Sequence, residues 1–579
     1  MNKHYSTEKN ILILISLLKA NGIRKVVASP GTTNYSLVGS LQSDPFFEIY
    51  SSVDERSAAF IACGLAAESG EPVMLTCTGS TASRNYYPGM TEAYYHKLPV
   101  LAVTSHQGLD RIGQLVSQNL DRRQIAKDAA LLSVELPVVK DGRDEAYVTM
   151  EVNKALLELR RNGGGPVHID IFTTYSNDFS VEELPKVRAF RRFFTDSTLP
   201  EIPANGTKAV FVGCHTKFTE EETKAIDAFC AKYDGVVICD HTSGYYGAYK
   251  LMPAMASQQH NASSPLPKFD LVIHIGEVSA AEYSNIQMGE VWRVSRDGEL
   301  RDPFKRLTNI FQMSEVEFFH NYAADGGTKR ELYDRCISAI KPLFSRLPEL
   351  PFSNLWSTSI VSQKLPKGSL LHLSASNTRR CWNMFWLPEG VESASNVGCC
   401  GIDGSTSTLI GASLANPDRL CFLATGDLAF FYDLNSLGNR HVGNNVRILL
   451  VNNGVGTEFK LRSHKCFAFG DEANNYMAAA GHYGNKSPEL IKHYAQDLGF
   501  KYLSATNKEE YLSVVDEFID PDYREKPVIF ELFTDYHDED EAINIIRNFE
   551  TDSKHKIANA VRSVVGESGL QAIRKVIGK

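Results

Sequence analysis

Residues 420–429 are Leu420-Cys421-Phe422-Leu423-Ala424-Thr425-Gly426-Asp427-Leu428-Ala429, and this segment indicates the architecture of the chain. Its first five residues form a short apolar run, which before a turn signal is typical of a buried strand. Thr425, Gly426 and Asp427 form a polar turn, and the apolar-rich residues 430–437 predict a helix. A buried strand that passes through a polar turn into a helix is the repeating unit of a parallel α/β sheet.

The same unit recurs along the chain. Apolar runs followed by turns or helical patterns lie at residues 26–29, 73–76, 100–103, 167–171, 209–213, 236–239, 271–276 and 446–451. The repeated order of strand, turn and helix predicts the α/β class, with three doubly wound parallel-sheet domains. In such sheets ligands bind beyond the carboxyl ends of the strands, and those ends carry the polar residues here.

Breaks in this repeated order predict three domains, at residues 1–180, 205–345 and 352–579. A linker is expected between about Asn177 and Gly206, where prolines and scattered charges interrupt the pattern. The stretch from about Ser553 to Lys579 is predicted to be a helical tail of the third domain.

An internal echo relates the first and third domains. Residues 54–66 and 403–415 share Asp, Ile, Leu and Ala at matched places, and each segment leads to an apolar strand that ends in Thr-Gly. Four identities are compatible with coincidence. The shared order of helix and strand nevertheless favours two structurally related domains that flank a different one.

Composition excludes several classes of protein. The 579 residues are 43% hydrophobic and 22% charged, with a net charge of −9, which is ordinary globular usage without a basic tract for nucleic acid or anionic membranes. The early apolar stretch 11–18 is too short to span a bilayer, so a cytoplasmic protein is expected. There is no Cys-x-x-Cys pair, and the adjacent Cys399 and Cys400 are expected to be small buried apolar residues.

Asp427 and Asn453, 26 residues apart, each follow a predicted strand. A carboxylate and an amide oxygen at neighbouring strand ends suit Mg²⁺, which prefers oxygen ligands and often binds substrate phosphates as well. The small Ala429 and a helix N-terminus at the same place favour a diphosphate. The alternative is that Asp427 only caps a helix and Asn452-Asn453 only form a turn.

A Gly-Asp pair followed about 25–30 residues later by Asn-Asn resembles the thiamin-diphosphate signature. The wider stretch 425–437 resembles the menaquinone-pathway branch, SEPHCHC synthase. Further matches occur in the same order over most of the chain, at Ser29-Pro30-Gly31, Asp54-Glu55-Arg56, Asn85-Tyr86-Tyr87-Pro88, Glu92-Ala93 and Gly401-Ile402-Asp403-Gly404. The resemblance implies a pyrimidine-binding domain, a central Rossmann-like domain and a diphosphate-binding domain.

The resemblance also implies roles for single residues. Glu55 matches the glutamate that hydrogen-bonds N1′ of the aminopyrimidine, although an exposed acid at the start of a helix is the simpler alternative. Ile402 matches the apolar wedge that bends the cofactor so that its two rings meet. Mg²⁺ is expected on Asp427, Asn453 and the backbone carbonyl of Val455. The remaining cofactor-binding residues expected are Gly426, Leu428, Ala429 and Ser376.

The substrate side departs from the family, whose synthases hold 2-oxoglutarate and isochorismate with several arginines. Thr33 and Val397 stand at two of the arginine positions, and His106-Gln107-Gly108 replaces an Asp-Arg-Pro run. Ser376 and Arg380 keep the family's spacing, and Gln118 matches a pocket glutamine. We therefore expect a carboxylate-bearing substrate held by fewer cations, with Arg84 or Arg111 as possible replacements.

Two further ionisable residues, His106 and Glu458, are candidates to reach the pocket. There either residue would give a proton to the enamine that decarboxylation leaves on the cofactor. The alternative is that they are surface residues. With Thr33, Gln118 and Arg380 they complete the predicted substrate pocket.

The resemblance implies an enzyme dependent on thiamin diphosphate and Mg²⁺ that decarboxylates a 2-oxo acid. The enamine that remains is then protonated or transferred to a carbonyl acceptor. A homodimer or tetramer with shared active sites is expected. The alternatives are a genuine SEPHCHC synthase, a non-catalytic cofactor-binding homologue and a flavin-dependent oxidase. The last is disfavoured because residues 208–321 hold no Gly-x-Gly-x-x-Gly.

Overall fold

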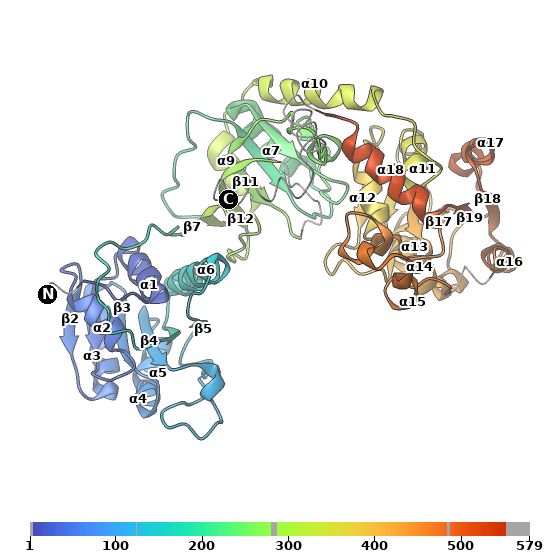
Figure 1. Cartoon of the computed structure of the whole chain (residues 1–579). Helices are drawn as coiled ribbons and strands as arrows, with labels where there is room; N and C mark the ends of the chain where they lie inside the picture. The colour runs from blue at the N-terminus through green and yellow to red at the C-terminus, as the bar shows by residue number, and fades with distance from the viewer. Residues whose placement is uncertain (1–3, 123, 279–285, 483–486, 552–579) are drawn as a thin grey trace, which may run out of the picture. The chain divides into compact units, whose positions relative to one another are not determined.

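The computed structural model describes residues 4–122, 124–278, 286–482 and 487–551. They form three parallel sheets with flanking helices, which confirms the predicted α/β class. The chain divides into two compact units (Figure 1). One holds the residues up to Phe194 together with Gly298–Ile310, and the other holds Thr195–Asp297 and the chain from Phe311 onward. The predicted domain limits stay a prediction, and the predicted helical tail lies outside the described residues.

The first sheet has the strand order β2-β1-β3-β4-β6-β5, and all its pairs are parallel. One apolar cluster joins it to α1 and α6 and a second joins it to α3 and α5, so helices cover both faces. The strands are β1 (Lys25–Ala28), β2 (Glu48–Ser51), β3 (Val73–Thr78), β4 (Val100–His106), β5 (Leu132–Leu136) and β6 (Val167–Phe172). The helices are α1 (Lys9–Ala20), α2 (Tyr35–Gln42), α3 (Glu55–Ser69), α4 (Thr81–Asn85), α5 (Tyr87–Tyr95) and α6 (Gly142–Glu158), with short 3-10 turns η1 (Leu109–Arg111) and η2 (Arg161–Gly163).

The second sheet includes, side by side, β10-β9-β8-β11-β12. These strands are β8 (Lys208–Val212), β9 (Gly235–Ile238), β10 (Lys250–Leu251), β11 (Phe269–Ile275) and β12 (Met288–Ser295). Its helices are α7 (Glu220–Tyr233), α8 (Ala254–Ser257), α9 (Glu315–Ala323) and α10 (Glu331–Ser345). Strands β7 (Arg191–Phe194) and β13 (Leu307–Gln312) lie where the chain passes between the two units, so the expected linker contains a strand.

The third sheet has the order β15-β14-β16-β17-β19-β18, again with parallel pairs. Its strands are β14 (Leu370–Leu373), β15 (Glu392–Ser395), β16 (Cys421–Gly426), β17 (Val446–Asn452), β18 (Lys501–Ala505) and β19 (Val528–Phe533). Its helices are α11 (Asn354–Val361), α12 (Asn377–Asn383), α13 (Ser405–Ala415), α14 (Asp427–Tyr432), α15 (Ala473–Tyr476), α16 (Leu490–Asp497), α17 (Lys508–Ile519) and α18 (Tyr536–Asn548). Its described residues also form the 3-10 segments η3 (Leu434–Gly438), η4 (Thr457–Lys460) and η5 (Lys465–Glu472).

The first and third sheets share one topology. If the six strands of each sheet are numbered in chain order, both follow the spatial order 2-1-3-4-6-5. Helices α3 and α13, which contain most of the two echoed segments, each precede the third strand of their sheet. The internal echo in the sequence therefore reflects two related folds.

Two local expectations were wrong. The helix predicted over residues 430–437 is α14 followed by η3, with a break at Asp433. Asp433 accepts hydrogen bonds from the backbone nitrogen and the hydroxyl of Ser407, both at 2.6 Å, and so connects to α13. Cys399 and Cys400 are exposed rather than buried, because they lie in the loop between β15 and α13.

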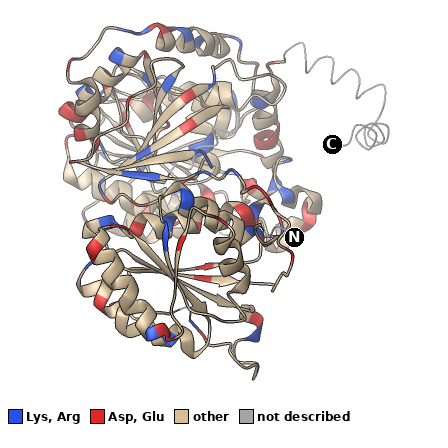
Figure 2. Cartoon of the chain, turned by 90° about the vertical axis from the view of Figure 1, so that its left-hand side faces the viewer, with Lys and Arg blue, Asp and Glu red and all other residues tan. Residues whose placement is uncertain are grey.

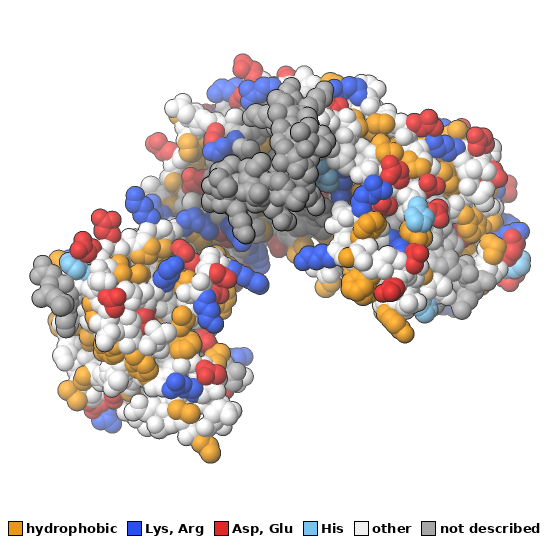
Figure 3. All heavy atoms as spheres, in the orientation of Figure 1, with side chains coloured by type: hydrophobic (Ala, Val, Ile, Leu, Met, Phe, Trp, Pro, Cys, Tyr) orange, Lys and Arg blue, Asp and Glu red, His pale blue; other side chains and the backbone are white. Residues whose placement is uncertain are grey.

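In Figure 2, Lys, Arg, Asp and Glu residues are spread over the helices and loops around the sheets, with some on the strands. On the face in Figure 3, described positive and negative side chains are interspersed without a broad patch of one sign. Among the described residues, no helix combines the length and apolar character that crossing a membrane requires.

Candidate active site

Asp427 and Asn453 follow two neighbouring strands of the third sheet. Gly426 of β16 is opposite Val451 of β17, so both residues emerge at the same edge. Asp427 Oδ2 accepts a hydrogen bond of 2.6 Å from the backbone nitrogen of Gly454, and Oδ1 accepts one of 2.7 Å from the backbone nitrogen of Leu428. The carboxylate of Asp427 therefore joins the two strand ends.

The charge of this carboxylate is poorly compensated. Asp427 is buried, with 6% of its surface exposed. Burial raises the pKa of Asp427 to about 6, although the backbone N–H groups of Leu428 and Gly454 oppose the shift. Backbone dipoles, rather than a cationic side chain of the described chain, are the largest stabilising groups for the charged form. A divalent cation would supply the missing positive charge.

The neighbouring oxygens suit such a cation. Asn453 is half-buried, and its Oδ1 accepts a 3.4 Å contact from the backbone nitrogen of Val455. The carbonyl of Val455 accepts a long 3.5 Å contact from the Thr457 hydroxyl. One carboxylate, one amide and one carbonyl are a donor set for Mg²⁺ with diphosphate oxygens completing the shell. Among the described residues, this site included, no group of three or more His, Cys, Asp or Glu residues is arranged to hold a metal.

The other predicted cofactor-binding residues lie close in sequence to this edge. Gly426 ends β16, and Leu428 and the buried Ala429 lie in the first turn of α14. Ser376 lies two residues beyond Ser374, whose hydroxyl donates to Thr425 at 2.8 Å, so the end of β14 is connected to that of β16. These residues fit a diphosphate held beside Asp427.

Ile402 precedes α13 and leaves 38% of its surface exposed. The nearby Leu409 and Ile410 of α13 are buried in the core, so Ile402 is not needed to fill it. An apolar side chain left uncovered by the described residues fits a contact with an organic cofactor.

Glu55 is the first residue of α3, in the other unit. Asp54 caps the helix by accepting from the backbone nitrogens of Arg56 and Ser57, which leaves the half-buried Glu55 carboxylate outside the cap. Asn85 Nδ2 donates to Glu55 Oε2 at 3.3 Å. Asn85 belongs to a stretch that the sequence singled out without assigning it a role.

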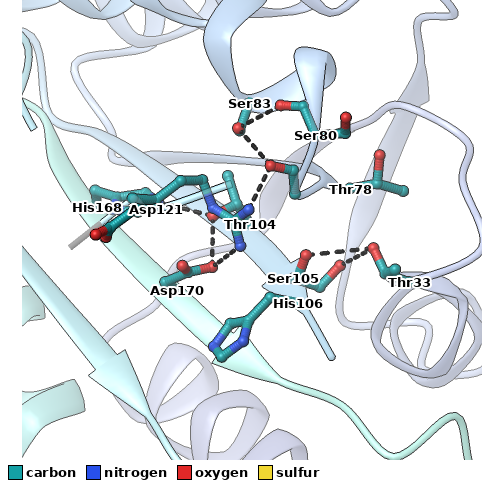
Figure 4. A network of polar contacts seen from close by, with 12 residues as sticks. Thr33, Thr78, Ser80, Ser83, Thr104, Ser105, His106, Asp121, His168 and Asp170 are labelled. Carbon is teal, nitrogen blue, oxygen red and sulfur yellow. Dashed lines mark hydrogen bonds and ion pairs between the residues drawn. The ribbon is translucent and has the colours of Figure 1, made fainter. Parts of the chain in front are cut away.

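Thr33 and His106 both lie at the carboxyl edge of the first sheet, but Thr33 contacts Ser105 and the His106 ring points away from it (Figure 4). The Thr33 hydroxyl lies 2.7 Å from that of Ser105 at the end of β4. His106 is 5% exposed, its ring stacks on Phe172, and its Nδ1 accepts from the backbone nitrogen of Gly108 at 3.0 Å. Burial lowers the pKa of His106, and its Nε2 has no hydrogen-bond partner within the described residues.

Gln118, in contrast, is exposed in the loop after β4, with a φ of +65°. The two arginines considered as replacements have other contacts. Arg84 donates to the backbone oxygen of Asp121 at 2.9 Å, and Arg111 donates to Gln107.

Sequence reasoning missed a buried ion pair at the same edge of the first sheet. Arg122 is 4% exposed, and its Nη2 lies 2.8 Å from Asp170 Oδ1. Thr104 donates to the same oxygen at 2.9 Å and contacts His168 Nε2 at 2.8 Å (Figure 4). The aspartate within the apolar strand 167–171 was the available signal, because a buried acid requires a partner.

Ser376, Arg380 and Glu458 form a second ion-pair cluster, in the unit that holds Asp427. Arg380 Nη1 lies 2.6 Å from Glu458 Oε2, and the Ser376 hydroxyl donates to the same oxygen at 3.0 Å. Burial raises the pKa of Glu458, but the hydrogen bond and charge of Arg380 outweigh it, and the net pKa is below the ordinary value. This argues against Glu458 as a proton donor at neutral pH.

Sequence reasoning also missed Glu531, a lone acid in the apolar run of β19. It is 1% exposed and accepts from Asn452 Nδ2 and from the Tyr502 hydroxyl, both at 2.7 Å. Burial raises the pKa of Glu531 despite these bonds. Glu531 therefore fixes the side chain of Asn452, next to the candidate ligand Asn453.

Comparisons with known proteins show which family the sequence resembles. Residues 12–125 match the family described as "Thiamine pyrophosphate enzyme, N-terminal TPP binding domain". The chain is 32% identical over 557 residues to the 2-succinyl-5-enolpyruvyl-6-hydroxy-3-cyclohexene-1-carboxylate synthase of Bacteroides fragilis, covering 92% of this chain and 97% of that protein. Enzymes with the same name from Bacteroides thetaiotaomicron and Phocaeicola vulgatus are 31% and 30% identical, each over 92% of this chain and 96% of its own length.

Proposed function

Since this chain belongs to the thiamin-diphosphate-dependent enzyme family that includes the 2-succinyl-5-enolpyruvyl-6-hydroxy-3-cyclohexene-1-carboxylate (SEPHCHC) synthases, we propose that it decarboxylates a 2-oxo acid. The remaining fragment is then protonated or joined to a carbonyl acceptor. The proposed cofactors are thiamin diphosphate and Mg²⁺. The observation that carries the proposal is the buried carboxylate of Asp427, hydrogen-bonded to Gly454 across two strand ends beside Asn453.

In this proposal, the residues of the third sheet hold the charged end of the cofactor. Asp427, Asn453 and the Val455 carbonyl would hold Mg²⁺ together with the diphosphate. The partly exposed side chain of Ile402 would contact the cofactor and hold its two rings together. Bound thiamin diphosphate supplies the carbon nucleophile and electron sink for decarboxylation.

Glu55 shares a proton with N1′ of the aminopyrimidine in this proposal. Its position outside the Asp54 cap leaves the carboxylate available for that bond, and Asn85 orients it. Glu55 and Asp427 belong to different units of the chain. As the family resemblance implies, we propose a homodimer or tetramer in which active sites are shared between subunits.

A second candidate is the SEPHCHC synthase reaction itself, which joins 2-oxoglutarate and isochorismate. The names of the relatives favour it. Against it stand the uncharged Thr33 and Val397 at two arginine positions, since each hydrogen bond to a charged group contributes about 1.5–3 kcal/mol.

A substrate screen tests the proposal. The full chain with thiamin diphosphate and Mg²⁺ is incubated with a set of 2-oxo acids, with and without aldehyde acceptors, and carbon dioxide release is measured. Turnover of at least one acid is expected, and omission of Mg²⁺ abolishes it. Formation of the joined product from 2-oxoglutarate and isochorismate would favour the synthase. A non-catalytic homologue would release no carbon dioxide and would not accelerate exchange of the cofactor's C2 proton.

A further inference from the structure

The ion pair of Arg380 and Glu458 lies at the carboxyl edge of the third sheet. Arg380 projects from α12, which follows β14, and Glu458 lies in η4, five residues after Asn453. Two contacts join the groups, 2.6 Å from Nη1 to Oε2 and 3.4 Å from Nη2 to Oε1. The guanidinium therefore presents both terminal nitrogens to one carboxylate, the geometry with which arginine binds a carboxylate ligand.

The surroundings hold this pair in place. The Arg380 and Glu458 side chains are only 18% and 28% exposed, so the contact is partly shielded from water. Arg380 Nη1 also donates to Asn377 Oδ1 at 2.8 Å. Ser376, whose hydroxyl donates to Glu458, has φ +65° and ψ −131°, a conformation that a non-glycine residue keeps only when its neighbours impose it.

The pair changes what Arg380 can recognise. A guanidinium with no acidic partner is free to pair with the carboxylate of a substrate. Here the carboxylate of Glu458 already occupies the guanidinium, and the lowered pKa of Glu458 keeps it charged at neutral pH. A second carboxylate would have to displace Glu458 or lie beside it, and either arrangement weakens its binding.

We propose that Glu458 is a specificity-determining residue that pairs with Arg380 and so restricts the donor to 2-oxo acids whose far end is uncharged. This inference rests on the proposed function, because it concerns the donor of that reaction. It identifies the chemical class as 2-oxo monocarboxylates, in preference to diacids such as 2-oxoglutarate. Arg380 then helps to position Glu458 rather than to bind a second substrate carboxylate.

A binding experiment tests the inference without turnover. Glutarate and butyrate, which lack the reactive 2-oxo group, are titrated into the cofactor-loaded full chain by calorimetry. We expect E458Q to bind glutarate about tenfold or more tightly than the wild type, because one competing charged hydrogen bond is removed, and to bind butyrate within about twofold. The matched control is E349Q, which alters an exposed glutamate paired with Lys508 and should change neither affinity.

A double variant assigns the gain to Arg380. In E458Q/R380Q the tighter binding of glutarate should disappear, and circular dichroism with thermal melting checks that each variant is folded. Equal glutarate affinity in the wild type and E458Q would overturn the inference. A gain that persists in the double variant would also overturn it, because the carboxylate would then be bound elsewhere.

A kinetic experiment separates the two proposals. The ratio of kcat/KM for 2-oxopentanoate over 2-oxoglutarate, acids of equal chain length, should exceed 1 in the wild type and fall about tenfold or more in E458Q. A wild-type preference for 2-oxoglutarate that E458Q leaves unchanged would overturn the inference and leave the proposed function standing. Tighter glutarate binding without decarboxylation of any 2-oxo acid would overturn the proposed function and leave the selectivity of the Arg380 site standing.

Discussion

A hydrogen bond of 2.6 Å from the backbone nitrogen of Gly454 to Oδ2 of Asp427 joins the end of β17 to that of β16. Gly454 has a φ of +71°, in the left-handed region that favours glycine, and this conformation aims its N–H at the carboxylate. The bond fixes one oxygen of Asp427 before any ligand binds. It therefore preorganises the proposed cation site.

Asp427→Asn should weaken the retention of thiamin diphosphate in the presence of Mg²⁺ by about tenfold or more, because the charged ligand is lost. Calorimetric titration of the cofactor at saturating Mg²⁺ measures the change. Asp418→Asn is the control, since Asp418 is exposed in the turn before β16. Wild-type affinity in the Asp427 variant would remove this residue from the metal site.

Glu55→Gln should still bind the cofactor but lose most of its activity, because an amide cannot share a proton with N1′. Exchange of the C2 proton of bound thiamin diphosphate, followed by NMR, should slow by about a hundredfold or more, within the usual range for a general acid–base group. Glu68→Gln changes an exposed acid at the other end of the same helix and should exchange at the wild-type rate. Fast exchange in the Glu55 variant would contradict the assigned role.

The sequence predicted those elements of the candidate site that patterns of neighbouring residues specify. The apolar run before Thr425-Gly426-Asp427 specified a strand, a turn and a helix start, and the echo between residues 54–66 and 403–415 specified two related sheets. The carboxyl ends of adjacent parallel strands necessarily share an edge. The proximity of Asp427 and Asn453 therefore followed from strand pairing alone.

Contacts between distant side chains did not follow from local pattern. The pairing of Arg380 with Glu458 depends on how η4 folds back toward α12, and a 3-10 segment has no hydrophobic period to predict it. The break of the predicted helix at Asp433 depends on Ser407, 26 residues earlier. Partners such as these are set by tertiary packing, which one sequence does not reveal.

Ile402→Ala should reduce activity while changing the free energy of unfolding by less than about 1 kcal/mol, because the side chain is partly exposed. Ile410→Ala, on α13, is the contrasting variant. Ile410 is 5% exposed in the core, so its truncation should cost about 2–5 kcal/mol. Chemical denaturation and carbon dioxide release are measured on both proteins. A large loss of stability in the Ile402 variant would place this residue in the core instead.

The buried His168 should make the first unit less stable as the pH falls. Burial lowers the pKa of His168 to about 4, below the ordinary 6.5, so the unfolded chain takes up the proton first. Stability is therefore fully present above about pH 6.5 and is lost as the pH falls toward 4, by about 2 kcal/mol between pH 7 and pH 5. His168→Gln keeps polar atoms for Thr104 and Ser133 but does not titrate, so its decline should be shallower.

Hydrogen–deuterium exchange of β4 and β6 measures the pH effect, because all four tryptophans lie between residues 292 and 386, in the other unit. The urea dependence of exchange gives the free energy of opening of the first unit at pH 7 and pH 5. His96→Gln, at an exposed position in the same unit, is the control and should follow the wild type. An equally steep decline of stability in the His168 variant would contradict the prediction. It would show that protonation of another group causes the pH dependence.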